Sequence, residues 1–453
     1  EEAKGEPGAR RKALEVLKWN STTAKAPPAQ GLSLGKATDF LEWEKYLREA
    51  KVIDLPADSQ PGAGNMLAAL DARFPLLKQL ADEAPKRPQA MFTPGLRERE
   101  MPGMLMAMRV PHYSVAQNLG RMLGLRARTA VAAGNSAEAA HSIQAAVRLA
   151  QGCRREPMLI GYLVAQGVEL MALEPLWLGL RTHLFTGDDL RLLHDLLSVD
   201  DTQAALLQSM RGELAAGLDA VEQLRVSAAG KRAASPKQAS ADADVKDAVR
   251  AILSGSDSAP APVRESAARR TLLLAMLPGG LFDHWKSALV EVELRSLLAP
   301  LKEGGLMQAI HAAGEAEQEL KQNANLLRHP DRLMVKFVVP AVTPVITNAL
   351  LGAARWKQAH TALALELFFA KQSRYPARLE ELVPEFLPAV PLDPCDGKPL
   401  RYANPAPDRF SLWSVGVDGV DNGGKVTVEG NGNAKLNKRE YQGDWTWQHE
   451  PVK

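Results

Sequence analysis

The chain of 453 residues lacks several features that would assign a function directly. It has two cysteines, Cys153 and Cys395, which are too few for a zinc site with four cysteine ligands. Lysine and arginine (55) nearly balance aspartate and glutamate (53), so the net charge is +2. Because no field of one sign is expected to attract phosphate backbones, nucleic acid is not predicted as a partner.

Long apolar runs are also missing. The most apolar stretch, residues 333–351, is interrupted by Lys336, Pro340 and Pro344, whereas a membrane-spanning helix needs about 20 apolar residues. The chain starts without a methionine and with a polar lead-in from Glu1. We therefore expect membrane attachment only through an anchor ahead of Glu1, removed by processing or trimming.

Motifs that would indicate catalysis are missing too. The sequence has no Gly-x-x-x-x-Gly-Lys-Ser/Thr phosphate loop, no nucleophile elbow and no His-Glu-x-x-His. The histidines are scattered, and we expect His183 and His194 to lie at the surface or at helix ends. The chain is therefore predicted to be non-catalytic. A hydrolase whose site is assembled from distant residues stays a third alternative.

Helix-forming residues dominate from about residue 36 to residue 371, with apolar side chains at helical spacing. The clearest unit is a helical hairpin over residues 112–149. Gly134 is expected to end its first helix, and Asn135 with Glu138 has the spacing of a capping box. This unit resembles one tetratricopeptide-type hairpin, but no second copy follows at a fixed period. We therefore predict a mainly α protein with an irregular helical bundle.

Further helix boundaries and linkers follow from composition. Pro157 is expected at the start of a third helix that runs to about His183, and Thr186 is expected to cap the next one. A bend is expected at Pro340 and Pro344. The predicted units are a lead-in (1–35), a helical domain (36–226), a flexible linker with a short helix (227–262), a second helical part (263–361) and a C-terminal module (362–453).

In the C-terminal module the pattern changes after Tyr375. Proline and glycine become frequent, and short alternating runs predict strands at residues 399–402, 410–414, 425–428 and 444–447. Because a long helix leads into these strands, the module is predicted to be α+β. Cys395 is expected to fill a small apolar gap, and Trp445 and Trp447 are expected to pack on one face of a strand.

The order of residues in this module resembles the soluble domain of the major pseudopilins of type II secretion systems. The matching segments are Arg374-Tyr375-Pro376, Leu382-Val383-Pro384, Leu392-Asp393-Pro394, Gly397-Lys398-Pro399, Phe410 to Gly416, Asp418-Gly419 and Asp421. The resemblance implies a long helix, a small sheet and a Ca²⁺ loop. In pseudopilins the helix begins the chain, whereas here a helical domain precedes it, as in uncharacterised planctomycete and verrucomicrobial envelope proteins.

The loop from Val415 to Gly424 suits a hard cation, because its carboxylates and carbonyl groups lie on a glycine-rich backbone. Asp418 and Asp421 are the first expected Ca²⁺ ligands. The resemblance adds the carbonyl group of Val415, and Asp444 is a further candidate on the last strand. The alternative is that Asp-Gly and Asn-Gly form tight turns without an ion.

Two functions compete on these observations. The first is an extracytoplasmic envelope scaffold, or a component of a secretion or pilus-like assembly, with a Ca²⁺-binding module and with proteins or copies of itself as partners. The second is a helical adaptor that binds peptides or proteins and has a purely structural C-terminal module. The second requires an apolar groove between helices, expected between residues 115–150 and residues 157–173.

Overall fold

The computed structural model describes residues 63–83, 86, 111–233, 279–322, 335–424 and 443–449. The predicted lead-in, most of the predicted linker and the strand expected at residues 425–428 lie outside these ranges. The described part is mainly helical, with one three-stranded antiparallel sheet. This confirms the predicted fold class at the level of a helical bundle followed by a small module with strands.

The predicted hairpin is formed by α5 (Pro111–Ala132) and α6 (Ser136–Arg154). Gly134 has a φ of 72°, and the Asn135 side chain accepts a hydrogen bond of 3.2 Å from the backbone N–H of Glu138. The Glu138 carboxylate does not complete the predicted box. It accepts hydrogen bonds from Lys78 and Arg126 instead, because a buried arginine and a nearby lysine compete for it.

Helix α7 (Leu159–Arg181) packs across this hairpin. It begins two residues after Pro157, with Met158 at the N-cap, so the predicted start was wrong. Helix α8 (Gly187–Leu197) follows Thr186 as expected, but the Thr186 side chain makes no capping hydrogen bond. In the described part of the chain, α7 is the one helix long and apolar enough to cross a membrane, and 61% of that stretch is buried inside the bundle.

Helix α9 (Thr202–Ala233) is longer than predicted. The expected linker was to begin at residue 227, where large apolar side chains end, but the helix continues to Ala233. Alanine, lysine and arginine in this stretch are good helix formers, which favours continuation of the helix.

The second helical part consists of α12 (Gly279–Glu293), a short π-helix (Leu294–Leu298), α13 (Ala299–Gln322) and α14 (Val335–Gln372). Gly305 interrupts α13 with a φ of 80°. Pro340 and Pro344 both lie within α14, which continues past them to Gln372. The helix is therefore continuous through both prolines, and its packing against α7, α9 and α13 stabilises it.

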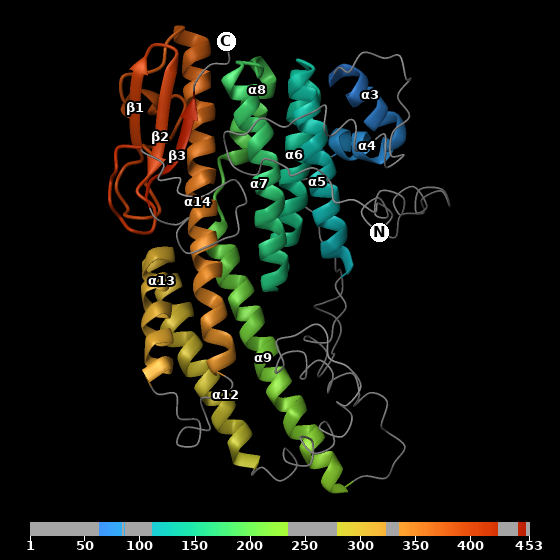
Figure 1. Ribbon diagram of the computed structural model, residues 1–453, viewed down its shortest axis with the longest axis vertical. Helices are drawn as coiled ribbons and strands as arrows, with labels where there is room; N and C mark the ends of the chain where they lie inside the picture. The colour runs from blue at the N-terminus through green and yellow to red at the C-terminus, as the bar shows by residue number, and fades with distance from the viewer. Residues whose placement is uncertain are drawn as a thin grey trace.

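Two hydrophobic cores share α14. The first unites α3 (Ala63–Arg73), α4 (Pro75–Glu83), α5 to α8, and the C-terminal half of α14, including Phe368. The second unites α9, α13 and the preceding part of α14, including Ile346. Figure 1 shows α14 running along the long axis, with the sheet beside one half and α12 and α13 beside the other. In the described part of the chain, α14 thus joins the first core to the second.

The sheet has the order β1 (Arg401–Ala406), β2 (Arg409–Ser414) and β3 (Trp445–His449). Leu412 lies opposite Tyr402 on one side and Trp447 on the other. Trp447 is fully buried in the first core, and Trp445 is 9% exposed in the second. Both tryptophans therefore pack in the interior, as expected, and the module is joined to both cores.

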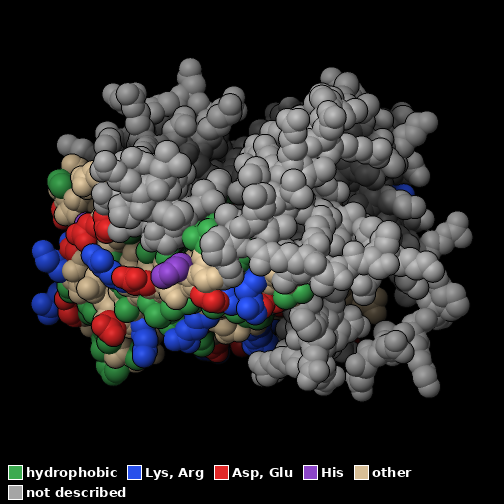
Figure 2. All heavy atoms as spheres, turned by 90° about the horizontal axis from the view of Figure 1, so that it is seen from below, with side chains coloured by type: hydrophobic (Ala, Val, Ile, Leu, Met, Phe, Trp, Pro, Cys, Tyr) green, Lys and Arg blue, Asp and Glu red, His purple; other side chains and the backbone are tan. Residues whose placement is uncertain are grey.

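The surface matches the balanced composition. Figure 2 shows acidic, basic and apolar side chains interspersed on the described part of one end of the molecule. No large patch of one charge is visible among the described residues of that face.

Candidate functional site

Asp393 is the centre of a buried polar network in the C-terminal module. Its side chain is fully buried, in a turn that Gly397 closes with a φ of 72°. One carboxylate oxygen accepts hydrogen bonds from the Cys395 backbone N–H (2.9 Å) and the Ser414 hydroxyl (2.7 Å). The other accepts from Arg401 (3.0 Å) and from the Val415 backbone N–H (3.0 Å). The bonds from Arg401, Ser414 and Val415 join the turn to β1, β2 and the loop that follows β2.

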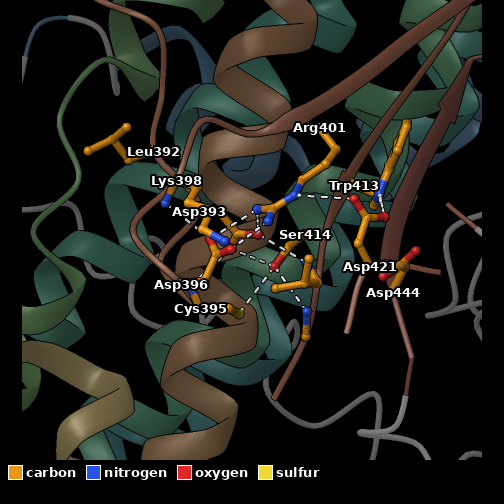
Figure 3. A network of polar contacts seen from close by, with 12 residues as sticks. Leu392, Asp393, Cys395, Asp396, Lys398, Arg401, Trp413, Ser414, Asp421 and Asp444 are labelled. Atoms are coloured by element: carbon orange, nitrogen blue, oxygen red, sulfur yellow. Dashed lines mark hydrogen bonds and ion pairs between the residues drawn. The ribbon is translucent and has the colours of Figure 1, made fainter. Parts of the chain in front are cut away.

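Arg401 extends this network toward the predicted Ca²⁺ loop (Figure 3). Its guanidinium donates to Asp396 at 3.0 Å and lies 3.7 Å from the Asp421 carboxylate. The hydrogen bonds from Arg401 hold the pKa of Asp396 below its ordinary value. The arginine is therefore a shared counter-ion for the turn and the loop.

The predicted metal ligands lie around one loop, each with its own contacts. Asp418 accepts hydrogen bonds from the backbone N–H groups of Val420 (3.1 Å) and Gly443 (3.0 Å). Asp421 accepts from the Trp413 indole N–H (2.9 Å) and the Gly423 N–H (2.9 Å), and these bonds lower its pKa. Asp421 is therefore held toward Trp413 and Arg401.

Asp444 closes the loop from the other side. One of its oxygens accepts from the N–H groups of Asn422 (3.0 Å) and Gly424 (2.7 Å). The other oxygen is buried and has no hydrogen-bond partner among the described residues. Figure 3 shows Asp421 and Asp444 side by side near Trp413.

These contacts test whether the four residues fit Ca²⁺. The orphaned oxygen of Asp444 and the hard oxygen donors of Asp418 and Asp421 suit the ion. However, no three His, Cys, Asp or Glu side chains in the described ranges form a group that could hold a metal. The Val415 N–H is bonded to Asp393, and no contact of its carbonyl group is described. The loop thus offers the oxygen donors that Ca²⁺ prefers. In this structure, Asp418, Asp421 and Asp444 accept hydrogen bonds from backbone N–H groups.

Cys395 lies within the same network and is 6% exposed. Its sulfur lies 3.1 Å from the Ser414 hydroxyl oxygen, whose single proton is donated to Asp393, and burial raises the pKa of the thiol above its ordinary value. Cys153 is also buried, and both cysteines are free thiols. Cys395 thus has the packing role expected of it, and its high pKa disfavours the reactive thiolate.

Two further polar clusters combine a tyrosine, a glutamate and a histidine. Glu366 on α14 accepts hydrogen bonds from Tyr375 and from His183 Nδ1, the latter at 2.9 Å. Glu156 accepts from Tyr113 and contacts His112 Nε2 at 2.9 Å. His183 lies directly after the C-cap of α7, as expected, and it also forms an ion pair that links the helical bundle to the C-terminal module.

A cavity of about 280 Å³ lies between α7 and α14. Its walls are mainly apolar and include Leu163, Leu170, Leu351 and Trp356. The groove expected between the α5–α6 hairpin and α7 is closed, because α7 fits directly against two glycines of α5. A Cβ atom on Gly120 would lie 2.7 Å from Val168, and one on Gly124 would lie 3.0 Å from the Met171 carbonyl oxygen.

Sequence reasoning missed Asp393, Arg401 and the α7–α14 cavity as functional features. The string Leu392-Asp393-Pro394 contributes to the pseudopilin resemblance, but the partners of Asp393 outside its own turn are 8 to 22 residues away. No family model, curated protein or solved structure matches the chain.

Proposed function

We propose that the protein is a non-catalytic scaffold that contacts other proteins through its C-terminal module. We place it outside the cytoplasmic membrane, in the envelope or in a secretion or pilus-like assembly. The observation that carries this proposal is the fixed attachment of the module to the bundle. Trp447 packs in the first core and Trp445 packs in the second. In addition, Gln358 on α14 donates a hydrogen bond of 2.6 Å to the Trp445 carbonyl group. A partner that binds the module would therefore be held rigidly against the helical bundle.

Exposed apolar side chains support a contact surface on this module. Leu392 is 50% exposed and Val420 is 55% exposed. Leu392 directly precedes Asp393, and Figure 3 shows its side chain apart from the polar network. Contiguous exposed apolar patches mark protein contact sites, and the proposal requires Leu392 and Val420 to belong to one such patch.

Photo-crosslinking in the cells that produce the protein tests this proposal. A photoreactive residue at Leu392 or Val420 should give crosslinks to protein partners or to a second copy. The control position is Val199 on the helical bundle, which is 66% exposed. Crosslinks from Val199 alone would contradict a contact surface on the module.

We also propose that Ca²⁺ binds the loop of Asp418, Asp421 and Asp444 and stabilises the module. The support is the set of oxygen donors and the orphaned Asp444 oxygen. An ion that binds only the folded loop adds about 2.7 kcal/mol at a hundredfold excess over its Kd. The wild-type melting temperature should therefore rise with Ca²⁺, and a variant with Asp418→Ala and Asp421→Ala should lose that rise. Equal wild-type melting in Ca²⁺ and in chelator would favour tight turns without an ion.

A second candidate is the helical adaptor, and the cavity between α7 and α14 favours it. The groove first expected for this function is filled by Val168 and Met171. The cavity on the other side of α7 has the apolar walls that a bound side chain requires.

A further inference from the structure

Two glycines, Gly167 on α7 and Gly352 on α14, line the cavity between these helices. A Cβ atom on Gly167 would meet no heavy atom within 4 Å. A Cβ atom on Gly352 would meet only the Gln166 side chain, with the amide nitrogen at 3.1 Å. The Gly167 backbone is therefore open to close approach by a ligand, whereas the Gln166 side chain lies against Gly352.

The apolar wall beside these glycines is already in place. Trp356 is 4% exposed, and its indole N–H donates to the carbonyl groups of Leu197 (3.0 Å) and Val199 (3.1 Å). These bonds fix the ring from behind, so the wall needs no rearrangement to receive an apolar group. Leu163 and Leu170 supply apolar surface from α7.

The cavity lining also contains an acceptor without a partner. Glu169 lines the cavity and is 6% exposed. One of its oxygens accepts a hydrogen bond from Arg154, and the other has no hydrogen-bond partner among the described residues. This second oxygen is itself buried, so the carboxylate has to turn toward the cavity for a ligand to reach it. A buried acceptor without a donor is unfavourable, so a ligand that brings a donor is favoured.

Gln166 supplies the complementary group. Its side-chain nitrogen donates one hydrogen bond, of 3.2 Å, to the Tyr162 hydroxyl. A primary amide carries two protons, so one donor is left for a ligand carbonyl group. An acceptor at Glu169 and a donor at Gln166, beside apolar walls, match the N–H and C=O groups that flank an apolar peptide side chain.

We propose that this cavity binds one large apolar side chain of a peptide, with the peptide N–H donating to Glu169 and its C=O accepting from Gln166. The volume of about 280 Å³ lies just below the roughly 300 to 1,000 Å³ of small-molecule sites, so it suits one residue-sized group. A lipid acyl chain would fill the apolar part but would bring no donor to Glu169. This inference rests on the adaptor candidate and does not depend on the C-terminal module.

Methyl NMR titration of the full chain with N-acetyl-L-leucinamide tests the proposal. The probe should shift the methyl signals of Leu163, Leu170 and Leu351, which line the cavity. A matched probe methylated at every amide nitrogen has no N–H donor and should bind about tenfold more weakly. Toluene serves as the purely apolar comparison.

Gly167→Leu should fill the cavity and abolish the shifts caused by N-acetyl-L-leucinamide. Gly314→Leu is the matched control, because Gly314 also lies on a helix and its Cβ would meet nothing within 4 Å. Binding of toluene without binding of the leucine probe would overturn the proposal and leave a simple apolar cavity. Equal binding of the methylated probe would also overturn it, and this comparison uses the wild-type protein alone. Crosslinks from Leu392 and Val420 on the C-terminal module do not depend on these results. The proposed peptide site and the proposed contact surface on the module can therefore be refuted separately.

Discussion

Replacing Asp393 by asparagine should release the C-terminal sheet from its turn. The amide keeps the shape of the side chain and can still accept from Cys395 and Ser414. Its NH₂ group, however, would face two donors, the Arg401 guanidinium and the Val415 N–H, which now lie 3.0 Å from the carboxylate. A lost charged hydrogen bond costs about 1.5 to 3 kcal/mol and an orphaned buried donor about 1 to 3 kcal/mol. We expect a total loss of about 3 to 5 kcal/mol, as for other broken buried ion pairs.

Hydrogen exchange measured by mass spectrometry is the appropriate assay, because it reports on the sheet separately from the bundle. A loss of this size should accelerate exchange in β1 and β2 by about a hundredfold or more. Peptides from α5 and α6 should be unchanged. Asp408→Asn is the matched control, because Asp408 is exposed and its ion pair with Arg409 is long at 4.0 Å. This variant should change the free energy of unfolding by less than about 0.5 kcal/mol. Equal exchange in the two variants would refute a stabilising role for the Asp393 network.

Two further predictions concern the helical bundle. Gly212→Ala should destabilise it strongly, because the new Cβ would lie 1.7 Å from the Pro157 carbonyl oxygen. The control is Gly167→Ala, whose Cβ would meet nothing within 4 Å. Similar melting temperatures for the two variants would contradict the close contact between Gly212 and Pro157. The hydrogen bond that His183 donates to Glu366 raises the pKa of His183. The stabilising effect of this pair is therefore present below about pH 6.5 and is lost as pH rises through the raised pKa. Between about pH 6 and pH 9 the wild type should therefore lose more thermal stability than His183→Gln, and parallel pH profiles would argue against the ion pair.

Local signals predicted local structure well. Gly134 ends α5 and Asn135 caps α6, because each acts through its own backbone conformation or through an amide three residues away. The same reasoning failed for Glu138, whose carboxylate is bound by Arg126 and Lys78 from other helices. A capping preference is worth little against a buried guanidinium that needs a counter-ion.

The strands of the C-terminal module were also predictable from alternation at residues 410–414 and 444–447. The Asp393 network was not, because its donors come from two strands and a loop that meet only after the sheet has formed. The cavity could not be predicted either. Its walls come from α7 and α14, which lie far apart in the sequence, and apolar periodicity does not specify which helix covers which face.

The shared helix α14 has a consequence for synthesis of the chain. The side chains of α5 to α8 that complete the first core against Phe368 are made long before α14 leaves the ribosome. Gln372 follows the end of α8 by about 175 residues, which at roughly 5 to 20 residues per second is a delay of about 10 to 35 seconds. During that interval the nascent bundle presents an uncovered apolar face. The growing chain is therefore expected to need a chaperone until its last helix arrives.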